Sequence, residues 1–201
     1  PDFQRKVKEF IKEMPARLKE YHEVFSGNVI AQNRLKGVGF LSREDAINYG
    51  VTGPSGRGSG WACDVRKRSP YAAYDKVQFD EVLYNEGDSY ARYMVRMKEI
   101  EQSLHILEQL VDNIPEGDYL AKTKPIIKVP EGRYFKEVEA ARGAFGIYLE
   151  SRGDKFPYRL KVNSPGFNLV GAVDHMTRGS KIADLIAIGG SLDYVVPDID
   201  R

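Results

Sequence analysis

Residues 87–117 read GDSYARYMVRMKEIEQSLHILEQLVDNIPEG, and this stretch decides the fold. Asp88 can cap the free N–H groups of a first helical turn, and Pro115 ends the pattern. About 26 residues of helix span roughly 39 Å, so the sequence predicts one long spine helix of a bundle. Its apolar side chains recur at steps of three and four residues: Tyr90, Tyr93, Met94, Met97, Ile100, Leu104, Leu107, Leu110, Val111 and Ile114.

A polar flank runs beside this apolar stripe. At about 100° per residue, one side of the stripe carries Arg92, Arg96, Glu99 and Ser103. An arginine this close to a buried face needs an acceptor, and Arg96 can pair with Glu99 three residues on. We interpret the four residues as a structural polar seam that locks the helix to a neighbouring element. The alternative is a charged lining beside a cavity.

The segments around the spine predict further helices. Apolar residues spaced three and four apart over residues 3–25 predict an amphipathic helix that is bent or interrupted at Pro15. Residues 42–50 predict a short helix with a serine cap and a glycine stop. The apolar run at 182–188 predicts a last helix.

A change of period predicts a small sheet. Apolar side chains alternate with polar ones at Phe145, Ile147 and Leu149, and again at Tyr158, Leu160 and Val162. With a turn at 152–155, this pattern predicts a two-strand antiparallel hairpin with one basic face. The expected class is α+β, mainly helical, in a single domain over residues 1–201.

Composition narrows the function further. The chain has 201 residues, 42% hydrophobic and 29% charged, which is typical of a globular protein. Its net charge of +1 gives no field that would attract polyanions, so we expect no nucleic-acid partner. No run of about 18 apolar residues predicts a membrane span. The start, which lacks both a methionine and an apolar signal region, is typical of a fragment.

Few residues suggest independent chemistry. Cys63 is the only cysteine, so the chain cannot ligate an iron–sulfur cluster or a cysteine-based zinc ion by itself. His22, His105 and His175 lack metal-ligand spacing and are expected at the surface. With neither a serine nucleophile elbow nor a Cys–His arrangement apparent, we expect no metal site and no catalytic residue of the chain's own.

The glycine-rich segment 50–61 invites a phosphate-binding interpretation, because glycines let backbone N–H groups approach an anion. However, no Gly-Lys-Ser/Thr follows, and no clear strand precedes it. We therefore favour a tight loop whose glycines allow close backbone packing.

Motifs along the whole chain resemble one family. They include Gly-Val-Thr-Gly-Pro at 50–54, Arg57-Gly58-Ser59-Gly60, Asp64-Val65-Arg66-Lys67, Pro70-Tyr71-Ala72-Ala73-Tyr74, Gly87-Asp88, Pro157-Tyr158-Arg159, Pro165-Gly166-Phe167 and Ser191-Leu192-Asp193. In this order they resemble the hydrogenase-like large subunit, known as the D subunit, of NADH-quinone oxidoreductase (respiratory complex I). The resemblance covers only the C-terminal half of that large subunit.

The resemblance implies a nickel–iron-hydrogenase-like large-subunit fold without its metal. Hydrogenases end in an Asp-Pro-Cys-x-x-Cys pattern whose thiolates bind the metal. Laying Asp193 on that aspartate puts Val195 and Asp198 at the cysteine positions. Valine cannot ligate nickel, and a lone carboxylate is a poor substitute for soft thiolate.

The resemblance also implies a role at the quinone. The vacated cavity, shared with a neighbouring iron–sulfur subunit, is where the family reduces the quinone headgroup. Asp193, Val195 and Arg201 match positions that line it, with Val195 as apolar lining and the other two as nearby charges. NADH, flavin and iron–sulfur clusters belong to partner subunits. The complex translocates protons, and this subunit lies in its peripheral arm at the cytoplasmic face of the inner (plasma) membrane.

Two alternatives remain open: a large subunit of a related membrane-bound hydrogenase-like complex, and a non-catalytic scaffold that docks neighbouring subunits. In either case, the half of the subunit outside this chain should cover the spine helix. We therefore expect the chain by itself to expose apolar surface along that helix and to self-associate.

Overall fold

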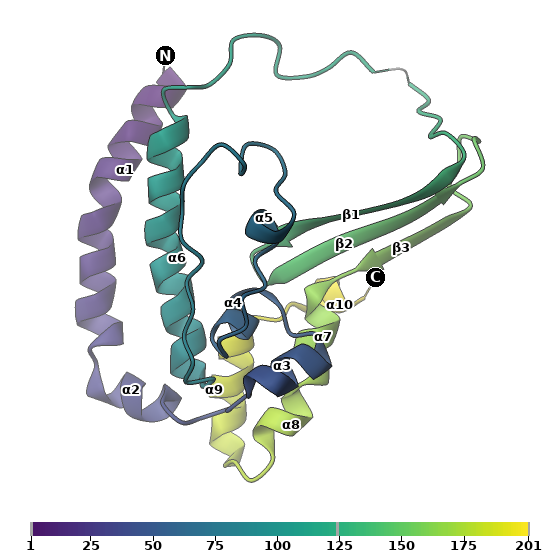
Figure 1. Ribbon diagram of the computed structural model, residues 1–201. Coiled ribbons are helices and arrows are strands. Elements are labelled where there is room, and N and C mark those ends of the chain that lie inside the picture. Colours follow the sequence, from purple (N-terminus) through teal and green to yellow (C-terminus); the bar gives the residue numbers. More distant parts are fainter. Residues whose placement is uncertain (1, 124, 201) are drawn as a thin grey trace.

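The computed structural model describes residues 2–123 and 125–200. Two long helices, α1 (Asp2–Tyr21) and α6 (Ser89–Leu110), lie side by side along one side of the molecule (Figure 1). A three-stranded sheet extends from the other side, and short helices gather below (Figure 1). The mainly helical α+β class that the sequence predicts is confirmed.

The spine helix α6 begins where the sequence predicts. The Asp88 carboxylate accepts a hydrogen bond of 2.7 Å from the Ala91 N–H and so caps the first turn. The helix has 22 residues and ends at Leu110, earlier than the predicted stop at Pro115. Asp112 and Asn113 precede that proline, and both are poor helix formers, so the last turn is lost.

The first helix is not interrupted at its proline. α1 continues through Pro15, so the predicted interruption there is wrong. Packing against α6 on both sides of Pro15 outweighs the one missing backbone hydrogen bond. The irregular turn falls later, in the five-residue π-helix η1 (His22–Ser26), where the Ser26 carbonyl accepts from the Tyr90 hydroxyl at 2.9 Å.

The apolar stripe of α6 is covered by α1. The buried residues of this contact are Leu18, Met97 and Leu104, with Ile11, Met14, Tyr93 and Ile100 packed around them. The expectation that this chain by itself exposes the apolar stripe of the spine helix is therefore wrong. α1 comes from the same 201 residues and shields the stripe from water.

A second side of α6 is also buried, which the predicted stripe misses. Val95 and Ile106 are 0% and 8% exposed, whereas Leu107, assigned to the stripe, is 36% exposed. Val77 and Phe79 cover Ile106 from the extended segment that precedes the helix. A stripe drawn for one buried face cannot show that a second segment packs on the other side.

The largest core lies among the short helices. These are α2 (Val29–Leu35), α3 (Arg43–Tyr49), α7 (Pro165–Gly171), α8 (Val173–Thr177) and α9 (Ile182–Leu192). The buried residues of this core come from α3, α7, α8, α9 and the segments beside them, while α2 packs against α9 without adding a buried residue. They are Leu41, Ala46, Val51, Leu169, Ala172, Met176, Ile188 and Leu192.

Two of these helices confirm predictions made from the sequence. α3 has its Ser42 hydroxyl accepting from the Asp45 N–H at 3.0 Å and stops at Gly50, whose φ is +66°. α9 contains the apolar run predicted at 182–188.

The glycine-rich segment is partly helical, which corrects the predicted loop. α4 (Gly53–Arg57) is a single turn, followed by irregular chain and the short α5 (Val65–Arg68). Close packing is confirmed: a Cβ at Gly56 would lie 2.3 Å from the Val51 carbonyl oxygen. At Gly53, whose φ is +68°, a Cβ would lie 2.5 Å from the Cα of Gly143.

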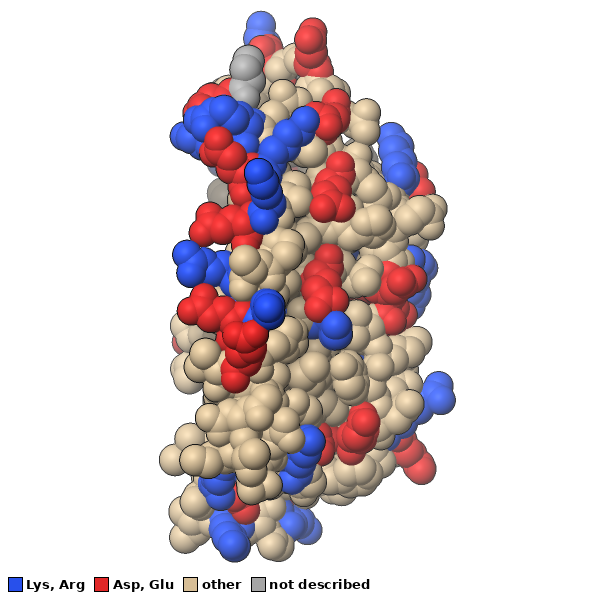
Figure 2. Space-filling view, turned by 90° about the vertical axis from the view of Figure 1, so that its left-hand side faces the viewer, with Lys and Arg blue, Asp and Glu red and all other residues tan. Residues whose placement is uncertain are grey.

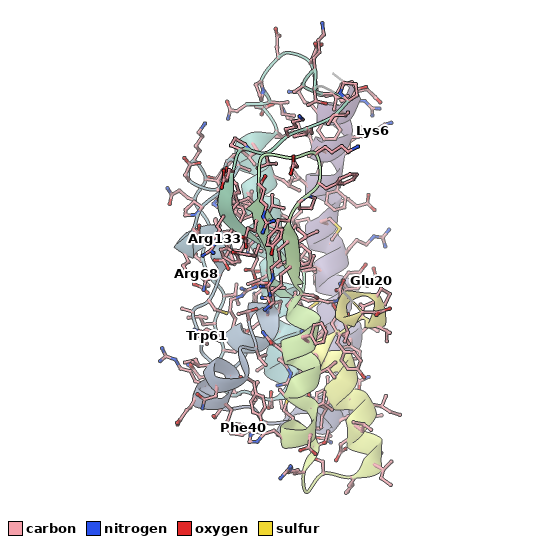
Figure 3. The ribbon with its side chains drawn as sticks, turned by 90° about the vertical axis from the view of Figure 1, so that its right-hand side faces the viewer. Lys6, Glu20, Phe40, Trp61, Arg68 and Arg133 are labelled. Atoms are coloured by element: carbon pink, nitrogen blue, oxygen red, sulfur yellow. The ribbon has the colours of Figure 1, made fainter. Side chains whose placement is uncertain are left out.

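The sheet has three strands in the order β1 (Gly132–Ala140), β2 (Gly143–Ser151) and β3 (Arg159–Asn163), all antiparallel. The predicted β2–β3 hairpin is confirmed, with Ile147 opposite Val162. The sequence does not predict β1, because the adjacent aromatic residues Tyr134 and Phe135 break the alternation of apolar and polar side chains. Its pairing with β2 along its whole length stabilises it instead. Arg68 of α5, labelled in Figure 3, also forms an ion pair with Glu137 of β1.

Burial on α6 yields a matched pair of variants. Leu104→Ala removes a side chain that is 8% exposed, and we expect it to lower the free energy of unfolding by about 2–5 kcal/mol. Leu107→Ala, one turn away and 36% exposed, should cost less than about 1 kcal/mol. Urea denaturation followed by circular dichroism measures both. Equal losses would contradict the packing of α1 on α6.

Candidate functional site

The segment that follows α9 contains the residues singled out from the sequence. α9 ends at Leu192, and Asp193 takes a left-handed conformation with φ of +57°. The chain then enters the short helix α10 (Val196–Ile199). We call residues 192–199 the C-terminal junction. Because left-handed backbone is disfavoured outside glycine, this turn needs support from its surroundings.

Arg142, in the turn between β1 and β2, provides part of that support. Its Nε donates a hydrogen bond to the Asp193 carbonyl oxygen. Its Nε and Nη1 also lie 3.6 and 3.7 Å from carboxylate oxygens of Asp193 and Asp198. α10 packs on α7, where a Cβ at Gly166 would contact Asp198 at 3.3 Å. The C-terminal junction is therefore folded back onto the protein.

Two of the three predicted quinone-cavity residues lie on this junction. The Asp193 side chain is 48% exposed, and Val195 is half-buried. Arg201 lies outside the described residues.

Arg92 connects the spine helix to the last turn of α9. Its side chain is 0% exposed. The guanidinium donates to the Ser191 hydroxyl at 2.9 Å, to the Gly87 and Gly39 carbonyls at 3.0 and 2.8 Å, and to the Ser89 hydroxyl. Burial lowers the pKa of Arg92, and Asp88 opposes that shift. Neutral oxygens thus solvate a buried cation.

The other three residues of the predicted seam separate. Arg96 donates to the Arg92 and Leu192 carbonyls. The predicted Arg96–Glu99 pair is replaced, because Glu99 lies 2.6 Å from Nη2 of Arg57 instead. Ser103 is exposed, and its hydroxyl donates to the Glu99 carbonyl of the same helix. The structure thus brings Arg92 and Arg96 to α9, Glu99 to a different cluster, and Ser103 to the surface.

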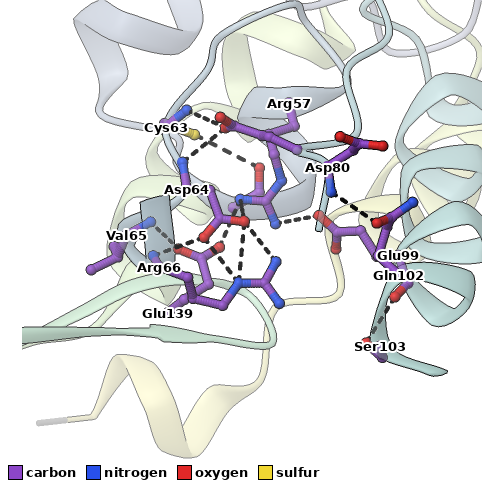
Figure 4. Close-up of polar contacts among 12 residues, drawn as sticks. Arg57, Cys63, Asp64, Val65, Arg66, Asp80, Glu99, Gln102, Ser103 and Glu139 are labelled. Carbon is purple, nitrogen blue, oxygen red and sulfur yellow. Dashed lines mark hydrogen bonds and ion pairs between the residues drawn. The ribbon is translucent and has the colours of Figure 1, made fainter. Parts of the chain in front are cut away.

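That second cluster joins five buried or mostly buried charged side chains: Arg57, Asp64, Arg66, Glu99 and Glu139 (Figure 4). We call it the charge cluster. Arg57, 1% exposed, lies at its centre, with Nη1 2.7 Å from Glu139 and 3.8 Å from Asp64. Arg66 donates two hydrogen bonds to Asp64 Oδ2, one from Nε at 3.2 Å and one from Nη2 at 2.6 Å. Glu139 also accepts from the Val65 N–H, so it fixes the start of α5.

Burial and countercharge oppose each other in the charge cluster. Burial acts to lower the pKa of Arg57, but Glu99 and Glu139 outweigh it and raise that pKa, so the guanidinium stays charged. Burial raises the pKa of Glu99 despite the nearby Arg57. Burial also acts to raise the pKa of Asp64, but hydrogen bonds from Arg66 outweigh it and the pKa is lowered.

The sequence does not predict that the residues of the charge cluster contact one another, although it gives one signal for Arg57. Arg57 stands alone among small residues in a glycine-rich segment, which signals a side chain enclosed by closely packed backbone. Glu139 lies on β1, the strand that the pattern does not predict. Without that strand, nothing places its carboxylate near Arg57.

The remaining reactive side chains are engaged or inert. Burial raises the pKa of the Cys63 thiol to about 12, so it is protonated and unreactive at neutral pH. His105 and His175 are exposed, but His22 is half-buried because its ring lies 2.8 Å from the Ser26 hydroxyl, which corrects the surface expectation. Across residues 2–123 and 125–200, no group of three or more His, Cys, Asp or Glu side chains is placed to hold a metal ion.

The fold and its contacts define a mainly helical α+β protein in which arginines hydrogen-bond to the C-terminal junction. The family model described as respiratory-chain NADH dehydrogenase, 49 Kd subunit, matches residues 1–128 and 121–201. The chain therefore belongs to the family of this 49 kDa subunit. Within the described ranges, no helix has both the length and the apolar character needed to cross a membrane.

Curated relatives agree with this assignment. The chain is 68% identical, over all of its 201 residues, to the C/D subunit of the NADH-quinone oxidoreductase of Phocaeicola vulgatus, covering 39% of that protein. It is 51% identical over 97% of its length to the D subunit of the same enzyme from Desulfotalea psychrophila, covering 53%. With the D subunit from Bacillus cytotoxicus it shares 44% identity over 98% of its length, covering 54%. The chain thus spans about half, or less, of these relatives.

The charge cluster yields a stability prediction. Arg57→Ala leaves three buried carboxylates without their shared cation, and we expect a loss of about 3–5 kcal/mol in the free energy of unfolding. Arg5→Ala removes two exposed ion pairs on α1 and should leave the free energy of unfolding nearly unchanged, because water screens such pairs. Urea denaturation of the two variants measures the difference. A loss for Arg57→Ala as small as the control's would show that the cluster contributes little.

Asp64 yields a pH dependence with a definite sign. Because its pKa is lowered in the folded chain, the ionised carboxylate stabilises the fold above its ordinary pKa, and this is lost as the pH falls. Asp64→Asn should therefore be less stable than the unmodified chain at neutral pH. The deficit should shrink as the pH falls below about 4, because the carboxylate of the unfolded chain then takes up a proton before that of the folded chain. Unfolding curves at a series of pH values measure it, and a deficit independent of pH contradicts the assignment.

Proposed function

We propose that this chain is part of a subunit in the peripheral arm of a proton-translocating NADH-quinone oxidoreductase, where it helps form the quinone-reduction cavity. The names of the relatives support the enzyme class. The observation that carries the cavity proposal is the C-terminal junction, which is held against Arg142 and α7 while Asp193 stays half exposed.

The chemistry of the junction suits a quinone headgroup. Reduction adds two electrons and two protons to the ring and converts it to a quinol. Val195 offers apolar surface to the ring, and Asp193 adds a charge beside it. The resemblance assigns a second nearby charge to Arg201, which lies outside the described residues. The electrons come from NADH through flavin and iron–sulfur clusters on partner subunits. Cys63 cannot supply such a cluster, because it is one buried thiol where several thiolates are needed.

The same proposal includes the fold of the chain, its partner subunit and its place at the membrane. The chain adopts the C-terminal half of a nickel–iron-hydrogenase-like large-subunit fold and meets the neighbouring iron–sulfur subunit at the cavity. It lies at the cytoplasmic face of the membrane and is attached there by partner subunits. In place of the terminal thiolates of a hydrogenase, the junction presents Val195 and Asp198, so a metal-binding relative is not favoured.

A docking scaffold is the second candidate, and exposed apolar side chains favour it. On α2, Val29 and Ile30 are 68% and 75% exposed, and on α9, Ile182 and Ile186 are 92% and 81% exposed. Figure 2 shows charges of both signs crowding the upper part of the α1 side and a mostly uncharged surface lower down. Such a surface suits protein partners without requiring contact with a substrate.

A photoreactive quinone analogue separates the two candidates. Irradiation of the assembled complex, followed by peptide mapping, should label the peptide that contains residues 191–200. Excess ordinary quinone should suppress this labelling by competition. Labelling confined to partner subunits would favour the scaffold.

A substitution tests the same proposal by kinetics. Val195→Phe should raise the KM for quinone several-fold or more, because it adds bulk to the cavity lining. Val24→Phe, at a valine of η1 that is 67% exposed, is the control and should leave quinone kinetics unchanged. If both variants behave like the unmodified complex, the junction does not line the cavity.

A further inference from the structure

Three consecutive residues at the end of α9 each accept a hydrogen bond from an arginine. Arg92 donates to the Ser191 hydroxyl, Arg96 to the Leu192 carbonyl at 3.4 Å, and Arg142 to the Asp193 carbonyl. Arg92 and Arg96 stand one turn apart on α6, and Arg142 reaches in from the sheet. The start of the C-terminal junction is therefore bound from two elements.

Arg96 occupies the central position in this arrangement. A carbonyl in the last turn of a helix has no partner within the helix, and the negative end of the helix dipole lies there. Arg96 satisfies the Leu192 carbonyl of α9 with Nη2, while Nη1 donates to the Arg92 carbonyl at 2.8 Å. One planar guanidinium thereby spans the spine helix and the end of α9, a geometry that the fork of arginine allows.

The charges around Arg96 direct it toward the junction. Burial lowers the pKa of Arg96, and Asp193 is the largest of the opposing influences, followed by Glu99. Arg57 and Arg142 act in the same direction as burial. Glu99 is itself engaged by Arg57 in the charge cluster, so Asp193 remains the principal countercharge for Arg96.

The layer beneath Arg96 restricts its movement. Arg92 is fully buried and makes four hydrogen bonds. A Cβ at Gly58 would lie 3.0 Å from the Arg92 side chain, so α6 is closely covered at this level. Arg96 therefore projects from a rigid base.

We propose that Arg96 is a positioning residue: by binding the Leu192 carbonyl from α6, it sets the direction in which the chain leaves α9. That direction fixes where Asp193 and Val195 stand at the quinone. The inference rests on the proposed function, and it assigns to Arg96 a role beyond joining two helices.

The test compares Arg96→Gln, Arg96→Lys and Lys98→Ala in the full-length subunit within the assembled complex. NADH oxidation is measured with a short-chain quinone and with ferricyanide, a soluble acceptor that does not need the quinone cavity. Arg96→Gln should lower kcat/KM for quinone on the order of 10- to 100-fold, chiefly through KM, with ferricyanide reduction unchanged. Arg96→Lys keeps the charge and loses the fork, so its loss should be intermediate. Lys98→Ala, at an exposed pair on the same helix, should match the unmodified complex.

The outcomes separate this inference from the proposed function. Unchanged quinone KM in Arg96→Gln overturns the positioning role. If Arg96→Gln fails to assemble, Arg96→Lys decides, and an unchanged KM there has the same meaning. If Val195→Phe alters quinone kinetics while the Arg96 variants do not, only the inference fails. If none of these variants alters quinone kinetics, the proposed function fails with it.

Discussion

A buried arginine has to find its countercharges inside the protein, and the placement of Arg57 sets much of this fold. Its side chain is 1% exposed, and carboxylates reach it from three directions: from α6, from β1 and from the segment before α5. Removing a charge from water is costly unless geometry and pairing are good. The sheet is therefore held against the helical part by a contact that tolerates little displacement.

The arginines of α6 follow a different rule. Arg92 has the Ser191 hydroxyl and backbone carbonyls as its close partners, so dipoles rather than full charges solvate it. Hydrogen bonds to a charged donor are stronger than neutral ones, and an unmet donor in a buried site carries the full cost of desolvation. The two arrangements explain why α6 contacts both α4, which carries Arg57, and α9. Each contact involves a different set of polar side chains on the same helix.

Sequence reasoning reaches the elements with strong local signals. The spine helix, the Ser42 cap of α3 and the pairing of β2 with β3 follow from period and from capping chemistry. It does not reach β1, whose stability comes from its partner strand, or the second buried side of α6 at Val95 and Ile106. Both depend on contacts between residues far apart in the sequence.

The same limit applies to the site. The angular position of Arg92, Arg96 and Glu99 on α6 follows from helical geometry, but their partners do not. Glu99 pairs with Arg57 rather than with Arg96 because Arg57 is buried and needs a countercharge, whereas a pair three residues apart on one helix adds only a few tenths of a kcal/mol. Arg142 illustrates the point again, since only the folded sheet brings it to Asp193.

The outer edges of the sheet bear on whether two copies of this protein can pair through their strands. Among the described residues, β1 and β3 have strand neighbours on one side only, so each presents an outer row of backbone groups that another chain's strand can bond. β3 carries the cations Arg159 and Lys161 and no acidic residue, whereas β1 carries Lys136 beside Glu137. The cations of β3 repel a second copy of that strand laid alongside it, which disfavours edge-to-edge pairing there.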